Sequence, residues 1–284
     1  MIGRPSRHHL RSPSTMTYAS TGQRSAEHRV SPIFLALAGV FLASGAALAA
    51  GWGNDRLGVF LFVVAGWMVS LCLHEYAHAR TALAGGDITV GTKGYLTLNP
   101  LKYGHVVLSF VLPVVFVIMG GIGLPGGAVY IERGRISGRL KHSLISAAGP
   151  LVNVAFGVVT LLLVSQGWFD NPELPATAGD VEYRFSALPA ALAFLAYLQV
   201  TASILNLLPV PGLDGYGIVE PWLSDRTRRA VAPYAPYGML LLFALVWQSQ
   251  VGQWLFDLTM RIFELFGVDQ GYLALGDHLF RFWK

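Results

Sequence analysis

The sequence predicts an all-α polytopic membrane protein with about five to six transmembrane helices. Hydrophobic residues make up 54% of the 284 residues and charged residues only 13%, whereas a soluble domain carries about 25% charged residues. Mean hydropathy is +0.52, and several apolar runs reach the length of about 20 residues that crosses a bilayer as a helix. The net charge of +4 is small and is confined to short segments, which argues against a nucleic-acid partner.

Residues 1–31 form a polar head that we expect to be disordered and to remain in the cytoplasm. The head contains five arginines and one acidic residue, Glu27, and it is too long and too polar for the first part of a cleaved signal peptide. Positive charge favours the cytoplasmic side of the first span. The apolar run Pro32–Ala50 then predicts that first span.

The second predicted span, Leu57–Ala84, contains the most informative motif. Residues 57–73 lack Asp, Glu, Lys, Arg and His, and His74-Glu75-Tyr76-Ala77-His78 follows directly. On a helix, positions four apart lie only about 40° apart, so both imidazoles share one face. They supply half of a tetrahedral zinc site, beside which Glu75 can act as general base towards a water. The alternative is a pair of core histidines bonded to backbone carbonyls, but polar clusters at the edge of hydrocarbon favour a functional site.

Three further apolar runs predict the remaining spans, at about His142–Val164, Leu188–Leu208 and Tyr234–Leu255. The acidic connection Ser165–Ser186 suits the outer face of the membrane, and the basic stretch Glu132–His142 suits the inner face. The second span returns the chain to the cytoplasm and contains the zinc motif near its end, which places the active site towards the cytoplasmic side.

Two elements after the zinc motif need separate treatment. The stretch Val106–Leu124 has basic flanks on both sides, so we expect a re-entrant or embedded element interrupted by Pro113, because 19 residues cannot cross twice. Such irregular backbone must be buried in protein or line a wet cavity. The segment Ile88–Leu98 predicts a small β-hairpin, whose edge could bind an unwound substrate by strand addition.

A third metal ligand is predicted at Asp214. It belongs to the segment Asn206–Gly215, in which prolines break the helix and glycines allow tight turns. An ordinary Asp-Gly turn is the alternative, but a proline-broken span beside a zinc motif favours the ligand. His105 and His142 adjoin basic loops, where we expect solvated or interfacial side chains.

The fourth candidate is Asn153, in the sequence that runs from Ala147 to Asn153. The small residues of this sequence allow close helix packing. Asn153 itself could hydrogen bond to the substrate backbone or oxyanion, as a catalytic residue, or could form an interhelical hydrogen bond. Both readings remain open at this point.

With these motifs in order, the chain resembles the site-2 protease family of intramembrane zinc metalloproteases, in the compact bacterial branch without a PDZ or C-terminal regulatory domain. The resemblance covers roughly residues 32–250 and rests on three motifs: His74-Glu75-x-x-His78, Gly149-Pro150-x-x-Asn153 and Asn206-x-x-Pro209-x-Pro211-x-Leu213-Asp214-Gly215. It implies Zn²⁺ as cofactor, with His74, His78 and Asp214 as ligands and Glu75 as general base.

The expected function is a zinc-dependent endopeptidase that cleaves transmembrane or membrane-proximal peptide segments. A membrane-protein or peptide substrate and the lipid bilayer are the expected partners, and the oligomeric state is left open, with a homodimer as one option. The expected location is a bacterial cell membrane. A catalytically silent scaffold and a metal transporter are the alternatives. The presence of Glu75 and all three ligands argues against the first, and the scarcity of other ligand-type residues in the spans argues against the second.

Residues 251–284 are expected to form an amphipathic interfacial tail. Asp257, Arg261 and Glu264 fall on one helical face, and apolar side chains cover most of the remaining surface. We expect this tail to serve in anchoring or self-association.

Overall fold

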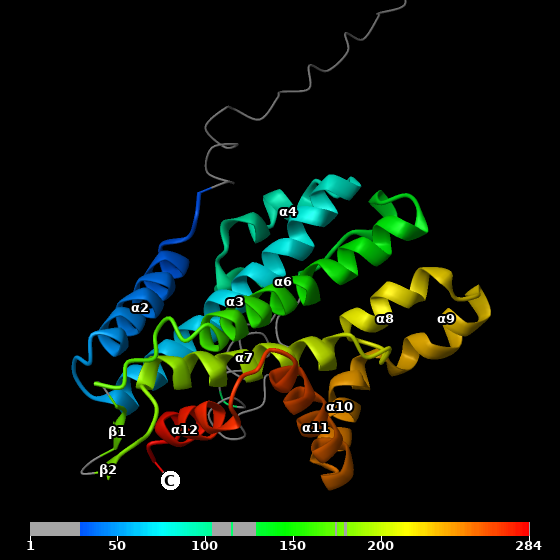
Figure 1. Ribbon diagram of the computed structural model, residues 1–284. Coiled ribbons are helices and arrows are strands. Elements are labelled where there is room, and N and C mark those ends of the chain that lie inside the picture. Colours follow the sequence, from blue (N-terminus) through cyan, green and yellow to red (C-terminus); the bar gives the residue numbers. More distant parts are fainter. Residues whose placement is uncertain (1–28, 104–114, 116–128, 174, 179–180, 284) are drawn as a thin grey trace, which may run out of the picture.

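The computed structural model describes residues 29–103, 115, 129–173, 175–178 and 181–283 (Figure 1). Within this part of the chain the fold is almost wholly helical, which confirms the predicted all-α class. Four helices are long and apolar enough to span a membrane: α2 (Pro32–Ala49), α3 (Asp55–Gly85), α6 (Arg139–Ser165) and α7 (Ala187–Asn206). They confirm four of the predicted spans. Most of the predicted head, and the predicted re-entrant stretch apart from residue 115, lie outside the described residues.

The first two spans begin and end at residues whose chemistry suits helix termini. The side chain of Ser31 accepts a hydrogen bond from the N–H of Ile33 at 3.2 Å, and that of Asn54 accepts from the N–H of Leu57 at 3.0 Å. Each bond satisfies an N–H group that the helix itself leaves unpaired. Helix α3 ends before Gly86, whose φ of +123° lies in the region that favours glycine.

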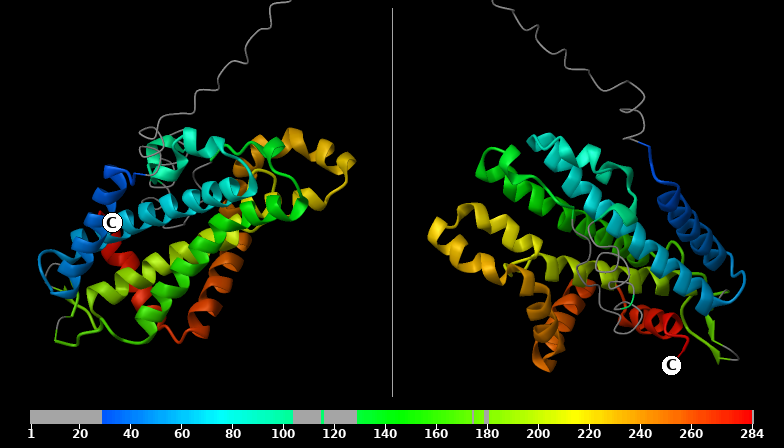
Figure 2. Two further views of the ribbon diagram at one scale, coloured as in Figure 1. Left: turned by 90° about the horizontal axis from the view of Figure 1, so that it is seen from above. Right: turned by 180° about the vertical axis from the view of Figure 1, so that it is seen from behind.

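Helix α7 forms the centre of the bundle. It contacts α6, α3 and the C-terminal helix α12 (Gln270–Phe280), while α2 packs along α3 (Figures 1 and 2). Large α7 side chains such as Phe194 and Leu195 are fully buried. A fully buried amide of α7, that of Gln199, donates to the hydroxyl of Ser70 on α3 at 2.7 Å. This hydrogen bond links α7 to α3 within the apolar interior.

The segment after the zinc motif is helical, so the predicted β-hairpin over Ile88–Leu98 was wrong. It contains α4 (Thr89–Thr92) and a short 3₁₀ turn, η1 (Tyr95–Thr97). The residues that flank η1, Gly94 and Leu98, both have left-handed backbone angles, with φ of +74° and +58°. These angles turn the chain instead of extending it. A second 3₁₀ turn, η2 (Pro100–Lys102), follows.

Two strands of two residues each lie in the connection between α6 and α7. They are β1 (Thr177–Ala178) and β2 (Val181–Glu182), which pair antiparallel. Beyond α7 the elements are α8 (Asp214–Val219), η5 (Glu220–Trp222), α9 (Asp225–Val231), η6 (Ala232–Tyr237), α10 (Gly238–Trp247) and α11 (Ser249–Leu265). A last 3₁₀ turn, η4 (Arg133–Arg135), precedes α6.

The predicted span Tyr234–Leu255 was wrong as a single helix. The apolar run of α10 stops at Gln248, whose extended backbone (φ −66°, ψ 118°) separates α10 from α11. Three polar residues in succession, Gln248, Ser249 and Gln250, mark this break in the sequence. The two helices contact each other beside the bundle (Figure 1).

The C-terminal helices are packed more closely into the fold than an interfacial tail requires. The three charged residues of α11 are exposed, as expected, but Leu255 and Phe263 of the same helix are buried. On α12, Phe280 is fully buried and stacks on Phe60 of α3 with ring centroids 5.5 Å apart. Part of the tail therefore belongs to the hydrophobic core.

Candidate metal centre

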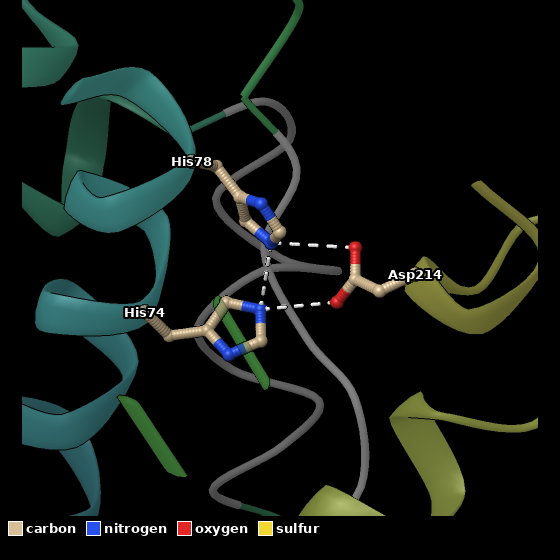
Figure 3. Close-up of side chains that lie close together, drawn as sticks. All are labelled: His74, His78 and Asp214. Atoms are coloured by element: carbon tan, nitrogen blue, oxygen red, sulfur yellow. Dashed lines mark hydrogen bonds and ion pairs between the residues drawn. The ribbon is translucent and has the colours of Figure 1, made fainter. Parts of the chain in front are cut away.

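The structure brings His74, His78 and Asp214 together from two distant parts of the chain (Figure 3). The Nε2 atoms of the two imidazoles lie 3.1 Å apart, and each lies 3.3 Å from a different carboxylate oxygen of Asp214. A tetrahedral zinc with ligand bonds of about 2.0–2.1 Å separates its donor atoms by about 3.3 Å. The three side chains therefore match one face of a tetrahedral site. Within the described ranges they are the one group of His, Cys, Asp or Glu residues that could hold a metal ion.

Both imidazoles are oriented by helix α6. The Nδ1–H of His78 donates to the backbone carbonyl of Ile145 at 2.7 Å, and that of His74 donates to Oδ1 of Asn153 at 2.7 Å. With a hydrogen on each Nδ1, the two Nε2 atoms carry lone pairs that face each other and a carboxylate. Three electron-pair donors at this distance repel one another unless a cation lies between them. The donor set therefore fits a divalent metal such as zinc.

Gly149 makes room for the metal centre. A Cβ atom at this position would overlap the Nε2 atoms of both His74 and His78. The next residue, Pro150, has no N–H, so α6 lacks one main-chain hydrogen bond in the turn that faces the histidines. The sequence Gly149-Pro150 thus serves the site directly, in addition to allowing helices to pack closely.

Asp214 reaches the histidines from an irregular segment between α7 and α8. The glycines of this segment lie against other backbone. Gly212 has a φ of +93°, and a Cβ on Gly215 would overlap the carbonyl group of Leu207. Both carboxylate oxygens of Asp214 face the histidine pair, and a bound divalent cation would hold this carboxyl in its charged form.

Glu75 lies beside the metal ligands and is almost fully buried. Its Oε2 accepts a hydrogen bond from the backbone N–H of Val129 at 3.1 Å. A cavity of about 780 Å³ contains this carboxylate and the three ligands, and its walls also include residues 129–134, Tyr216, Glu220 and Arg228. The cavity provides space for a peptide segment and for water beside the metal centre.

The predicted site residues have different outcomes. The structure places Glu75, His74, His78 and Asp214 in one cavity, whereas Asn153 bonds to a ligand and its predicted contact with substrate stays a prediction. The ring of His142 bonds to the carbonyl of Ile136 at 3.1 Å, away from the metal centre, and His105 lies outside the described residues.

Two contributors to the site escaped sequence reasoning. The carbonyl of Ile145 and the N–H of Val129 are backbone groups, and no residue type identifies them. The space at Gly149 could have been suspected from the adjacent Gly-Pro pair, but its partner atoms come from another helix.

Known proteins that are similar to this chain have names that describe zinc metalloproteases. The chain is 44% identical over 260 residues to the protein named "Putative zinc metalloprotease Rip2" of Mycolicibacterium smegmatis, covering 90% of this chain and 95% of the relative. It is also 44% identical over 270 residues to the protein of the same name from Mycobacterium tuberculosis, covering 94% and 98%. The protein named "Putative zinc metalloprotease YwhC" of Bacillus subtilis is 28% identical over 194 residues, covering 66% of this chain and 81% of the relative.

No family model matches the chain, and no solved structure matches it. The two mycobacterial relatives align along almost their whole length. Residues of the first and third motifs line one cavity, and Asn153 of the second motif bonds to the ligand His74. The chain belongs to the site-2 protease family of zinc metalloproteases, in its compact branch.

Proposed function

We propose that this protein is a zinc-dependent endopeptidase that hydrolyses peptide bonds in transmembrane or membrane-proximal segments of its substrates. The observation that carries the proposal is a set of two imidazoles and two carboxylates in one cavity: His74, His78 and Asp214 with donor atoms 3.1–3.3 Å apart, and Glu75 beside them. Relatives named as zinc metalloproteases support the same reaction class.

The residues divide into metal ligands and a general base. His74 and His78 present Nε2 lone pairs, and Asp214 presents a carboxylate, so these three would hold Zn²⁺. Bound there, the ion would supply polarisation of a peptide carbonyl and would lower the pKa of a water to about 7. Glu75 would accept the proton of the attacking water and deliver it to the leaving amine. One Glu75 oxygen is held by the N–H of Val129, which leaves the other for proton transfer.

The setting supports a membrane substrate. Helix α3, which presents both histidines, is of spanning length, and so are three other helices of the described part. A substrate helix must unwind locally before hydrolysis, because a helical peptide carbonyl is already hydrogen bonded and sterically shielded. We propose residues 32–250 as the catalytic core, in a bacterial cell membrane with a cytoplasmic N-terminus and the active site towards the cytoplasmic side. The basic residues near the cavity, Arg133 and Arg228, suit that side.

The experiment that tests the proposal uses full-length protein in detergent and a single-span substrate whose products are read by mass. We expect wild type to cleave within or next to the apolar segment, and Glu75→Gln to keep one zinc per chain. Cleavage by Glu75→Gln should fall about 10²- to 10⁴-fold, the usual contribution of a general base. Asp214→Ala should lose zinc and activity together, because it removes a ligand.

Glu264→Gln is the matched control, since Glu264 is an exposed acid on α11. This variant should keep both zinc and cleavage. Full zinc occupancy in Asp214→Ala would remove Asp214 from the ligand set, and wild-type cleavage by Glu75→Gln would refute the assigned general base. Cleavage of soluble, polar peptides without cleavage of the single-span substrate would contradict an intramembrane substrate.

A further inference from the structure

A buried carboxylate near the end of α3 has no part in the mechanism above. Asp87 is 0% exposed, and burial of an unpaired carboxylate is costly. Its Oδ1 accepts hydrogen bonds from the N–H and the hydroxyl of Thr89, at 2.9 and 2.7 Å, and its Oδ2 accepts from the N–H of Glu132 at 2.8 Å. Burial alone would raise the pKa of Asp87, but these bonds and the nearby Lys93 ammonium lower it. The side chain is therefore charged at neutral pH.

The segment Val129–Glu132 connects this carboxylate to the active site. At one end the N–H of Val129 donates to Glu75 at 3.1 Å, and at the other end the N–H of Glu132 donates to Asp87. Between them, Lys93 donates to the carbonyl of Tyr130 at 3.2 Å and pairs with Glu132 at 3.3 Å. The segment is thus attached to the end of α3 at one point and to the proposed general base at another.

The position of the Glu75 carboxylate depends on this attachment. The N–H of Val129 bonds to one oxygen of the Glu75 carboxylate and so restricts its rotation. Asp87 in turn holds the segment that contains Val129, through the N–H of Glu132. A displacement of about 1 Å at a reacting group can cost about 10²-fold in rate. Asp87 itself is not among the residues that line the metal-centre cavity, so it acts at a distance from the reacting atoms.

We propose that Asp87 is a positioning residue for Glu75, acting through the backbone of the segment Val129–Glu132. The inference rests on the proposed function only in giving Glu75 the role of general base. The hydrogen bond that attaches the segment to Asp87 does not depend on the proposed function. Loss of Asp87 should free the segment, let the Glu75 carboxylate rotate, and slow proton transfer while leaving the metal ligands in place.

The test compares Asp87→Ala with Thr89→Val and Asp87→Asn in the full-length, zinc-loaded protein. Thr89→Val removes one donor to Oδ1 but leaves the bond from Glu132 to Oδ2, so it is the matched control. We expect Asp87→Ala to keep one zinc per chain and a KM within about twofold of wild type, while kcat falls about 10- to 100-fold. Asp87→Asn keeps one acceptor oxygen for the N–H of Glu132 but turns its NH₂ group towards the N–H of Thr89, so its kcat should fall between those of wild type and Asp87→Ala.

Hydrogen–deuterium exchange supplies a readout that does not require activity. The amides of Val129 and Glu132 should exchange at least about tenfold faster in Asp87→Ala than in wild type or Thr89→Val, because each loses an ordered acceptor. Unchanged exchange in Asp87→Ala would overturn the attachment, and unchanged kcat together with faster exchange would overturn the positioning role. Loss of zinc in Asp87→Ala would show a structural role instead.

The two hypotheses fail in different ways. If wild-type protein cleaves no peptide at all, the proposed function fails, while the exchange rates still decide whether Asp87 holds the segment. If wild type cleaves and Asp87→Ala cleaves equally well, the function stands and the positioning role is refuted.

Discussion

The two sides of the metal centre are constructed in different ways. His74 and His78 project from the interior of α3, a regular helix of 31 residues, and each ring is bonded to α6 at 2.7 Å. Asp214 is the first residue of α8, a helix of only six residues, and follows a segment without regular structure. On the helical side, the spacing of four residues alone places both imidazoles on one face. On the Asp214 side, the position of the carboxylate depends on backbone contacts between segments far apart in the sequence.

This difference indicates which substitutions would displace the metal ligands on each side. The helical side can be damaged only by filling the space around the rings or by removing their partners on α6. The Asp214 side can be damaged by any added atom that pushes α8 away, since its glycines lie against the carbonyl groups of Leu207 and Ala235. Substitutions on the two sides should therefore differ in what they change first.

The largest effect is expected on the helical side, from Gly149→Ala. The new Cβ would overlap the Nε2 atoms of both histidines, which is the space a metal would share. We expect zinc affinity to fall about 100-fold, because the overlap with two ligand atoms should cost near the upper end of the usual range of about 1–3 kcal/mol for overpacking, and each 1.4 kcal/mol is a factor of ten. Gly157→Ala, on the same helix, meets its neighbours at 3.4 Å or more and should bind zinc normally. Equal binding by both variants, measured by metal titration, would contradict the role of Gly149.

A smaller effect is expected on the Asp214 side, from Gly215→Ala. The added Cβ would overlap the carbonyl groups of Leu207 and Leu208, so α8 must shift and carry Asp214 with it. We expect zinc affinity to fall about 10- to 100-fold, with a lower melting temperature even without metal. In Gly149→Ala, by contrast, the metal-free protein should melt nearly as wild type. Gly134→Ala has open space around its Cβ and is the control. If Gly215→Ala keeps its affinity, the carboxylate does not depend on this close approach.

The same contrast explains what could be predicted from the sequence. The four spanning helices and the shared face of His74 and His78 follow from local patterns, namely apolar run length and the helical period. Asp214 was identified because a proline-broken segment with an acid is unusual at membrane depth. The hairpin predicted over Ile88–Leu98 and the continuous span over Tyr234–Leu255 failed, because left-handed backbone at Gly94 and Leu98 and an extended Gln248 are single-residue events.

The supporting contacts of the site were beyond sequence reasoning for a different reason. The carbonyl of Ile145, the N–H of Val129 and the space at Gly149 gain their roles only from atoms on another element. Every residue has a carbonyl group, so composition and spacing contain no signal for the one that orients His78. The long-range partner of Asn153 was left between two alternatives for the same reason.

The smallest effect on zinc affinity is expected from Asn153→Ala. This substitution compares the two histidines, because it removes the partner of only one of them. Asn153 orients His74 through a side chain, whereas Ile145 orients His78 through a backbone carbonyl that substitution leaves in place. Asn153→Ala should therefore free one ring only, and loss of such a partner weakens metal binding about 10-fold, the low end of the usual 10- to 100-fold range. Asn153→Asp keeps an acceptor at the same distance and should restore most of the affinity, whereas Ile145→Val keeps the carbonyl and should have no effect. Metal titration distinguishes these outcomes. If Asn153→Ala binds zinc as tightly as wild type yet cleaves slowly, Asn153 acts on the substrate, and the bond to His74 is incidental to its role.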